Sequence, residues 1–234
     1  NNLNVLFLAQ RIYTDLAYET TNKLAVLAPG SAQMQEVIAE RLVNAGDLRD
    51  AIEYYRKALA IDPRLGGVHL ELGEAILQSA PSNPQNQAAA KQEFETAERT
   101  EGDSAAIECQ LGEIAFRQSS VTDAYAHYRR AFTLNPGDAE ADLGMGKVLM
   151  TRGKLQQAIA YLRMAIRSDP LNADAHYRLA VAYDKLKLTD ESKKEFHLFQ
   201  DIKQTKERVA LLNSEMNPRT RAQRMPGAAA AKAK

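Results

Sequence analysis

The sequence predicts an all-α protein, built as a solenoid of stacked antiparallel helix pairs that ends in a C-terminal capping helix. One phrase, "AIEYYRKALAIDP" at 51–63, recurs as "AYAHYRRAFTLNP" at 124–136 and as "AIAYLRMAIRSDP" at 158–170. The last two copies follow each other at a step of 34 residues, which also separates Pro136 from Pro170. A fixed period of this length is typical of helix–turn–helix units that are too small to bury an apolar face alone. The abundance of Ala and the absence of Trp also favour close-packed helices over sheets.

Residues 104–136 show how one unit is built. Ser104 is a predicted N-cap, and Gly112 lies on the apolar face of the first helix beside other small and aliphatic residues. A polar turn, "RQSSVTD", leads to a second helix that presents Tyr128 and two alanines at helical spacing. Pro136 then blocks continuation of that helix. Small residues are expected where two helices cross closely, and large ones where the neighbouring helix leaves a hole.

The chain resembles the tetratricopeptide repeat family, whose signature is a bulky residue, Leu-Gly, a large residue, and then Ala, Phe or Tyr, Ala and Pro over a 34-residue unit. The resemblance covers roughly residues 12–204, and it implies a right-handed solenoid, the superhelix of that family. It is carried by Ile38, Ala39, Leu42, Gly46, Ala51, Tyr55, Ala58, Pro63, Met145, Gly146, Leu149, Ala158, Leu162, Ala165, Pro170, His176, Leu179, Ala180, Tyr183 and Phe196.

The repeat pattern predicts five units within a solenoid at 31–204. Residues 1–30 are predicted to form a divergent or truncated N-terminal repeat or cap, because Ala17 and Pro29 fit the pattern while the residues between them depart from it. The five units are expected at 31–63, 66–102, 104–136, 138–170 and 172–204.

The unit at 66–102 contains an insertion. Its second-helix anchors Ala90, Phe94 and Ala97 arrive five residues late, and the extra residues fall in "SAPSNPQNQ" at 79–87. The Pro and Asn content of this stretch predicts an enlarged loop between the two helices. Gly102 occupies the terminal Pro slot and is expected to cap the helix instead.

The last unit lacks the closing Pro, so its second helix is predicted to continue through 205–216 as an extension of the C-terminal capping helix. One face of a capping helix packs on the stack and the other faces water. Residues 217–234 contain five bases, no acids and an alanine run, which predicts a basic, disordered tail. The apolar stripe of the capping helix is predicted to consist of Phe196, Phe199, Ile202, Val209 and Leu212.

The net charge is zero, but its distribution is uneven. Residues 1–120 carry 17 acids and 10 bases, net −7, and residues 121–234 carry 13 acids and 20 bases, net +7. This asymmetry bears on association rather than on fold. The sequence contains no apolar run long enough for a transmembrane span, and one cysteine excludes an internal disulfide framework. A soluble protein is expected, cytoplasmic or, if a leader has been removed, periplasmic or exported.

Catalytic interpretations find little support, and no enzyme activity, metal or cofactor is predicted. No HExxH or CxxC motif occurs. His69 and His176 occupy the slot of a bulky aromatic residue, so packing explains them better than ligation. Cys109 has Glu113 one turn later, and a carboxylate raises a thiol pKa rather than activating the thiol. Carboxylate pairs such as Glu71 and Glu74 are interpreted as helix-surface pairs.

The resemblance implies that the first helices line a concave face that holds an extended or helical segment of a partner. Glu40, Glu74 and Glu113 occupy the same slot in consecutive units, and stacking is expected to bring them within roughly 10 Å of one another. Like charges so placed repel, and a basic ligand would relieve that cost, although any single Glu is equally well explained as part of a solvated face. The predicted partner-binding residues are Glu36, Glu40, Val43, Asn44, Leu70, Glu74, Leu77, Gln78, Cys109, Glu113, Phe116, Arg117, Leu143, Lys147, Met150, Tyr177, Val181 and Lys185.

Two function classes follow. The first is a non-catalytic interaction scaffold for a protein or peptide that is basic and partly apolar. The Lys/Asn/Arg clamp for a C-terminal carboxylate is missing, because its slots hold Glu36, Glu40, Leu70 and Glu74 among others, so chaperone tails are not expected. Nucleic acid is not an expected partner either. The alternative class is a structural spacer or a self-associating module driven by the charge asymmetry between the two halves.

Overall fold

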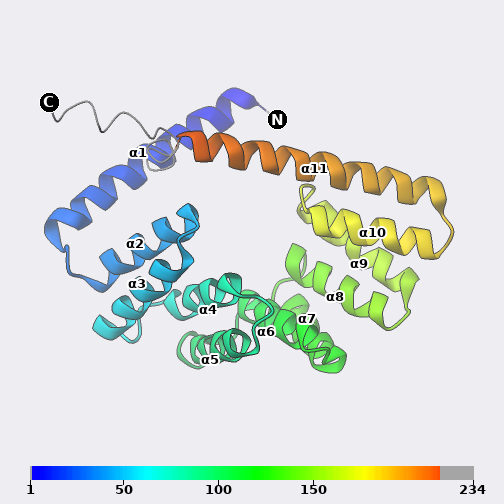
Figure 1. Cartoon of the computed structure of the whole chain (residues 1–234), viewed down its shortest axis with the longest axis horizontal. Coiled ribbons are helices and arrows are strands. Elements are labelled where there is room, and N and C mark those ends of the chain that lie inside the picture. The colour runs from blue at the N-terminus through cyan, green and yellow to red at the C-terminus, as the bar shows by residue number, and fades with distance from the viewer. Residues whose placement is uncertain (1, 217–234) are drawn as a thin grey trace, which may run out of the picture. The chain divides into compact units, whose positions relative to one another are not determined.

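The computed structural model describes residues 2–216, and side chains up to residue 212; the basic tail predicted at 217–234 lies outside the described residues. These residues form eleven helices and no strand (Figure 1). None of the described helices has the length and apolar character needed to cross a membrane. The helices are α1 Leu3–Leu27, α2 Ala32–Ala45, α3 Leu48–Ile61, α4 Val68–Ser79, α5 Pro84–Glu101, α6 Ala105–Arg117, α7 Val121–Leu134, α8 Ala139–Thr151, α9 Leu155–Ser168, α10 Ala173–Lys185 and α11 Thr189–Met216.

The chain divides into two compact units, residues 1–127 and 128–234. In the first unit, α2 packs on α3 and α4 packs on α5, and the two pairs are joined through α3 and α4. Its core consists of the small and large anchors of the repeat, such as Ala58, Leu72 and Phe94, which are at most 1% exposed. The predicted all-α class and the stacking of helix pairs are therefore confirmed within this unit.

The second unit repeats the arrangement with α8 on α9 and α10 on α11, joined through α9 and α10. Leu162 and Leu179 form its apolar centre and are 0% and 1% exposed. Gly146 lies where α8 crosses α9, and a Cβ atom added there would lie 2.7 Å from the Leu162 side chain. Gly73 has the same role in the first unit, since a Cβ atom there would fall on the Phe94 ring. The small residues of the repeat thus permit the close helix crossings that the sequence predicts.

The insertion at 79–87 differs from its predicted form. The loop is short, because α4 ends at Ser79 and α5 begins at Pro84. The extra residues instead lengthen α5 to 18 residues, against 14 in α3 and α9. Asn83 caps this added turn by accepting a hydrogen bond from the Gln85 backbone N–H at 2.8 Å. Asn followed by Pro is the sequence of an N-cap and first helical residue, which explains why the chain turns helical so early. The turn at 80–83 has four residues, against two or three in the other turns between first and second helices, so most of the insertion lies in the helix and only a small part in the loop.

The two ends of the described chain are single long helices. Residues 3–27 form one continuous helix, α1, rather than a helix pair, and none of its residues is buried. At the other end, α11 continues without interruption through residue 216, in agreement with the predicted extension. Its predicted apolar stripe is only partly covered: Ile202 is 8% exposed, whereas Val209 and Leu212 are 50% and 56% exposed.

Three His–Glu contacts link a first helix to the second helix of the same pair. His69 and His176 pack in the slot of a bulky aromatic residue as predicted, and each also contacts a glutamate. In the pair α6–α7 the two roles are exchanged: the first helix carries the glutamate and the second helix carries the histidine. Measured from Nδ1 of His to Oε2 of Glu, the distances are 2.7 Å for His69–Glu93, 2.8 Å for His127–Glu108 and 2.7 Å for His176–Glu195.

Candidate functional site

An acidic hollow of about 260 Å³ lies between α2, α3 and α4 in the first unit. Three successive helices contribute its walls, because the repeat places the inner faces of α2 and α4 on either side of α3. Five of the lining residues were predicted from the repeat columns, and three, Tyr55, Glu71 and Ala75, were not. The lining consists of Glu40, Val43, Asn44, Tyr55, Glu71, Glu74, Ala75 and Gln78.

Three carboxylates converge beside this hollow, and two of them, Glu40 and Glu71, also line it. Oxygen atoms of Glu36, Glu40 and Glu71 lie within 4.8 Å of one another. Glu36 and Glu40 are one helical turn apart on α2, and Glu71 approaches them from α4. The Tyr55 hydroxyl donates a hydrogen bond to the Glu71 carboxylate. The second oxygen of Glu71, Oε2, is buried and has no hydrogen-bond partner among the described residues.

This crowding changes the acidity of the groups. Burial, followed by the charges of Glu36 and Glu40, raises the pKa of Glu71 to about 7, and the Tyr55 hydrogen bond only partly opposes the rise. Burial and then the Glu40 charge also raise the pKa of Glu36. The pKa of Tyr55 is raised by burial and then by the Glu71 charge. The cluster therefore holds negative charge at a cost that a cation would relieve.

The third member of the predicted acidic column lies elsewhere. Glu40 and Glu74 line the hollow, but Glu113 does not. Glu113 pairs with Arg117 on its own helix at 2.8 Å, and the Gln110 side chain donates to Glu74 at 2.9 Å. The structure thus brings together two of the three predicted glutamates and adds Glu71.

The other predicted residues lie on the expected first helices but differ in accessibility. Leu77, Cys109 and Lys147 are 7% exposed or less, so a partner cannot reach them in this conformation. Those that are half-buried or exposed remain predictions: Leu70, Phe116 and Arg117 in the first unit, and Leu143, Met150, Tyr177, Val181 and Lys185 in the second.

The place of Glu71 differs from the one predicted from the sequence. Its spacing predicts a helix-surface pair with Glu74, whereas it is half-buried against Tyr55 and two carboxylates from α2. A signal existed, since Glu71 follows the column residue Leu70 and therefore turns toward the neighbouring second helix. Tyr55 occupies the bulky slot of that helix, and its hydroxyl needs a buried partner.

The arrangement suits binding rather than bond making. One cation, a protonated amine or a guanidinium could contact several of the carboxylates at once. Carboxylates alone also match hard metal ions, but exposed acidic groups often cluster without one, and no metal site is inferred from them. The expectations that the chain is not an enzyme and needs no metal stay predictions.

Solved structures share the fold. The crystal structure of MamA is 24% identical, with a TM-score of 0.55, and covers 73% of this chain and 97% of that one. The crystal structure of YrrB, described as a TPR protein with an unusual peptide-binding site, is 24% identical, with a TM-score of 0.53 over 78% of this chain and 91% of that one. The Cut9–Hcn1 structure reaches a TM-score of 0.71 at 18% identity, covering 79% of this chain and 36% of that one. At these identities the likeness shows the fold alone.

Curated relatives match over shorter segments. The TPR repeat-containing thioredoxin TTL4 of Arabidopsis thaliana is 33% identical over 75 residues, which are 32% of this chain and 11% of that protein. Cellulose synthase operon protein C of Komagataeibacter xylinus is 39% identical over 80 residues, which are 34% of this chain and 6% of that protein. The matched segments are thus small parts of both relatives.

The repeat itself is recognised in both units. The family model described as Tetratricopeptide repeat matches residues 36–104 and 143–192, more than half of the chain. These ranges contain α4 and α5 in the first unit and α9 and α10 in the second, and they include the acidic carboxylates described above. The chain belongs to the tetratricopeptide repeat family.

Proposed function

We propose that this chain is a non-catalytic interaction scaffold, and that the acidic hollow between α2 and α4 receives a basic side chain from a protein or peptide partner. The observation that carries the proposal is the convergence of Glu36, Glu40 and Glu71, whose carboxylate oxygens lie within 4.8 Å of one another. Like charges at such distances repel by an amount that grows as water is excluded. A Lys or Arg side chain placed among them removes the repulsion and adds charge-assisted hydrogen bonds.

The size of the hollow fits this role. Its volume of about 260 Å³ is below the range of roughly 300–1,000 Å³ typical of sites that enclose a whole small molecule. It is therefore suited to one side chain of a larger partner. Half-buried Val43 also lines the hollow, so an apolar residue flanking the basic one would find a contact. The fold relative YrrB is described as having a peptide-binding site, and this supports a peptide partner here.

A defined peptide pair tests the proposal. One fluorescent peptide carries a single Arg between leucines, and its twin carries citrulline, which keeps the shape of Arg without the charge. The Arg peptide is expected to bind more tightly, by roughly tenfold or more, because one pairing of about 1.4 kcal/mol separates the two. Its affinity should fall as salt is added, whereas the affinity of the citrulline peptide should not.

Variants locate the site. The double substitution Glu40→Gln with Glu71→Gln should abolish the difference between the two peptides, and Glu53→Gln, an exposed carboxylate on α3, should leave it intact. Binding of the Arg peptide should also strengthen as the pH rises through about 7, since Glu71 becomes charged there. If both peptides bind equally, or if the double variant keeps the preference for Arg, the acidic hollow is not the binding site.

A further inference from the structure

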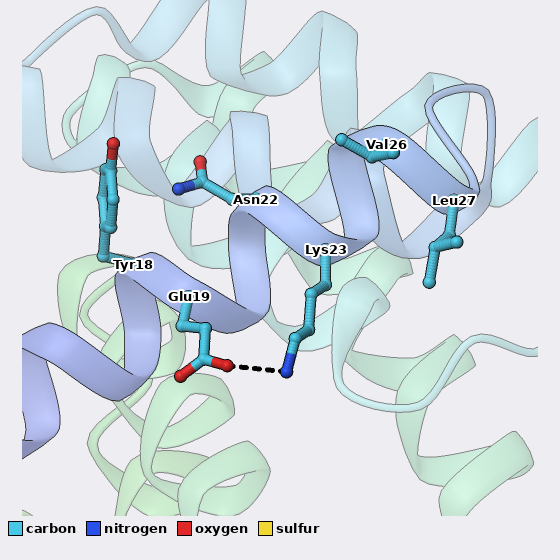
Figure 2. Close-up of a pocket in the computed structure, with 6 residues that line it drawn as sticks. All are labelled: Tyr18, Glu19, Asn22, Lys23, Val26 and Leu27. Atoms are coloured by element: carbon cyan, nitrogen blue, oxygen red, sulfur yellow. Dashed lines mark ion pairs between the residues drawn. The ribbon is translucent and has the colours of Figure 1, made fainter.

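Besides the acidic hollow, the first unit has an apolar hollow on its first helix. It measures about 490 Å³, and all of its lining residues come from α1 (Figure 2). Its two charged side chains, Glu19 and Lys23, pair with each other at 2.6 Å, so their charges compensate each other and select no partner. Another hollow of the same unit differs in both respects, because three helices line it and its basic residues are not paired.

This other hollow, of about 320 Å³, is lined by residues of α3, α4 and α5. Its apolar part is made by Ile52, Ala89 and Ile76, of which Ile76 is only 4% exposed and belongs to the core. Two arginines and a glutamate of α3 add charge, and we call this site the basic hollow. It shares no residue with the acidic hollow. The lining consists of Arg49, Ile52, Glu53, Arg56, Ile76, Asn86 and Ala89.

The insertion that interrupts the repeat supplies part of this lining. The helices α3, α7 and α9 each begin three residues before their first anchor alanine, whereas α5 begins at Pro84, six residues before Ala90. Asn86 therefore lies in the added turn. Its side-chain amide donates hydrogen bonds to the Ile76 carbonyl at 3.0 Å and to the Ser79 hydroxyl at 2.9 Å. These bonds fasten the added turn to α4, so the basic hollow is a fixed feature of this one repeat.

The two arginines lie on one side of α3. Arg49 and Arg56 are seven residues apart, which is about two helical turns and roughly 10.5 Å along the axis. Among the second helices of the repeat, α3 alone has a base at both of these positions. The corresponding pairs in the other second helices are Ala88 and Glu95, Thr122 and Arg129, Gln156 and Arg163, and Asp190 and His197.

Glu53 has the spacing to pair with either arginine but pairs with neither. It follows Arg49 by four residues and precedes Arg56 by three, the separations at which opposite charges meet on a helix. Among the residues that the structure describes, neither arginine side chain has an ion pair or hydrogen bond. Both are exposed, and a guanidinium group matches the geometry of a carboxylate. The two arginines are therefore available to acids of another molecule.

The pattern of α3 at the basic hollow defines a complementary helix. Arg49, half-buried Ile52 and Arg56 stand at positions i, i+3 and i+7. A partner helix that lies along α3 complements them with two acids at the same spacing and an apolar residue between them, all on one face. Each pairing of Arg with a carboxylate adds charge-assisted hydrogen bonds. The apolar residue of the partner would cover Ile52 and the adjoining apolar lining.

We infer that the basic hollow binds an acidic amphipathic helix of a partner protein, whose two acids contact Arg49 and Arg56 and whose apolar residue enters the hollow. This inference does not depend on the acidic hollow, because the two sites have no residue in common. The first unit then has two docking surfaces of opposite charge, one for a basic side chain and one for an acidic helix.

Three fluorescent helical peptides test the fit to the full chain. The first carries Glu, Leu and Glu at positions i, i+3 and i+7 in a background of Ala and Gln, the second has Gln for both Glu, and the third has Ala for Leu. Measured by anisotropy, the first should bind at least roughly tenfold more tightly than the second and several-fold more tightly than the third. Its affinity should fall as salt is added.

The third peptide separates the basic hollow from general attraction of acids to the second half of the chain, whose net charge is +7. That attraction does not require an apolar residue. If the first and third peptides bind equally, or the first and second do, the inference is wrong. Circular dichroism of the three peptides checks that their helical contents are equal.

Substitution of the two arginines locates the site. Arg49→Gln with Arg56→Gln should abolish the preference for the first peptide over the second. The matched control, Arg41→Gln with Arg64→Gln, removes two exposed arginines of the first unit that do not line the hollow, and should keep the preference. If the first variant keeps the preference, or the control loses it to the same extent, acids bind elsewhere on the chain and the inference is overturned.

A substitution that fills the hollow tests the same site while keeping both arginines. Ala89→Glu should weaken binding of the first peptide at least roughly tenfold, whereas Ala88→Glu, an exposed neighbour outside the hollow, should change it little. Glu40→Gln with Glu71→Gln should leave this binding unchanged, which distinguishes failure here from failure of the acidic hollow. Thermal unfolding checks that each variant is folded. A folded Ala89→Glu variant that binds the first peptide normally overturns the inference.

Discussion

At the scale of single residues, the informative positions are the polar slots inside the helix pairs. The slot that holds His69, Glu108 and His176 in three repeats holds Asp142 in the fourth. The equivalent position on the second helix holds Glu where the first helix has His, and His where it has Glu. In the repeat of Asp142 this position holds Tyr161 instead. In three repeats the group in this slot thus has a His–Glu hydrogen bond, while both carboxylate oxygens of Asp142 are buried without a hydrogen-bond partner among the described residues.

An unpaired buried carboxylate favours its neutral form. Burial and then the Asp138 charge raise the pKa of Asp142 to about 6 from 3.8, although the Arg167 charge opposes this. The side chain is fully buried, at 0% exposure. Since the folded pKa exceeds the unfolded one, the folded state takes up a proton between about pH 4 and 6, and the stability this gives is lost as the pH rises through 6.

Replacing Asp142 with Asn is therefore expected to stabilise the protein at neutral pH. The variant carries no charge to bury, and a shift of about two pKa units corresponds to at most roughly 3 kcal/mol. We expect a gain of about 1–3 kcal/mol in the free energy of unfolding at pH 7.5, shrinking toward zero at pH 4. Urea unfolding at both pH values measures it.

A matched control separates the effect of removing a buried charge from the effect of removing any carboxylate. Asp184→Asn removes an exposed carboxylate from α10 and should change stability little at either pH. If Asp142→Asn is destabilising at pH 7.5, or if its effect does not depend on pH, the carboxylate is not held in a strained buried state.

Whether the position of a residue can be predicted from the sequence depends on the role of that residue. The core slots are predictable, because Ala58, Ala131 and Leu162 recur at fixed spacing and all are 0% exposed. Glu71 was not predictable from its type, because acids at helical spacing usually face water. Its position is decided by Tyr55, a side chain on another helix whose hydroxyl needs a partner. Such contacts across helices have no signature in the local sequence.

At the scale of elements, four of the five turns between first and second helices share one backbone requirement, and the turn between α4 and α5 does not. Gly46, Ser119, Gly153 and Lys187 occupy equivalent repeat positions, and their φ angles are 83°, 62°, 73° and 61°. This left-handed conformation suits glycine, whereas a residue with a Cβ atom adopts it at a cost of about 1–2 kcal/mol. Two of the four turns therefore carry strain in exchange for keeping the repeat geometry.

Lys187→Gly is expected to relieve this strain between α10 and α11. The gain is offset in part by the greater freedom of glycine in the unfolded chain, so the net effect should be about 0.5–1 kcal/mol of added stability. Thermal unfolding followed by circular dichroism measures it. Lys194→Gly, within α11, is the control and should lose about 1 kcal/mol. A loss at position 187 as well would contradict the assigned turn conformation.

The insertion after α4 shows the limit of prediction for elements. Pro and Asn are common in loops, and for that reason the stretch at 79–87 predicts one. The same two residues also begin helices, and Asn83 and Pro84 do so here. The following run of glutamine and alanine has high helix propensity and decides between the two outcomes. The position of the insertion was thus predictable, but its shape depended on weighing residues on both sides.

At the scale of the whole molecule, each unit gains its stability from contacts between neighbouring helices. In such repeat arrays the stability of a helix depends on the interfaces it forms with neighbouring helices, and a helix at the end of the array forms fewer interfaces. The first helices α4 and α6 have six and seven buried residues, whereas α1 has none. The free energy of local opening is therefore expected to differ widely along the first unit.

Hydrogen exchange followed by mass spectrometry makes this measurable. The amides of α1 should exchange much faster than those of α4 and α6, because no buried side chain of α1 opposes its opening. Exchange of α1 as slow as that of α4 and α6 would contradict this, because it would mean that contacts which the structure does not show hold the helix closed.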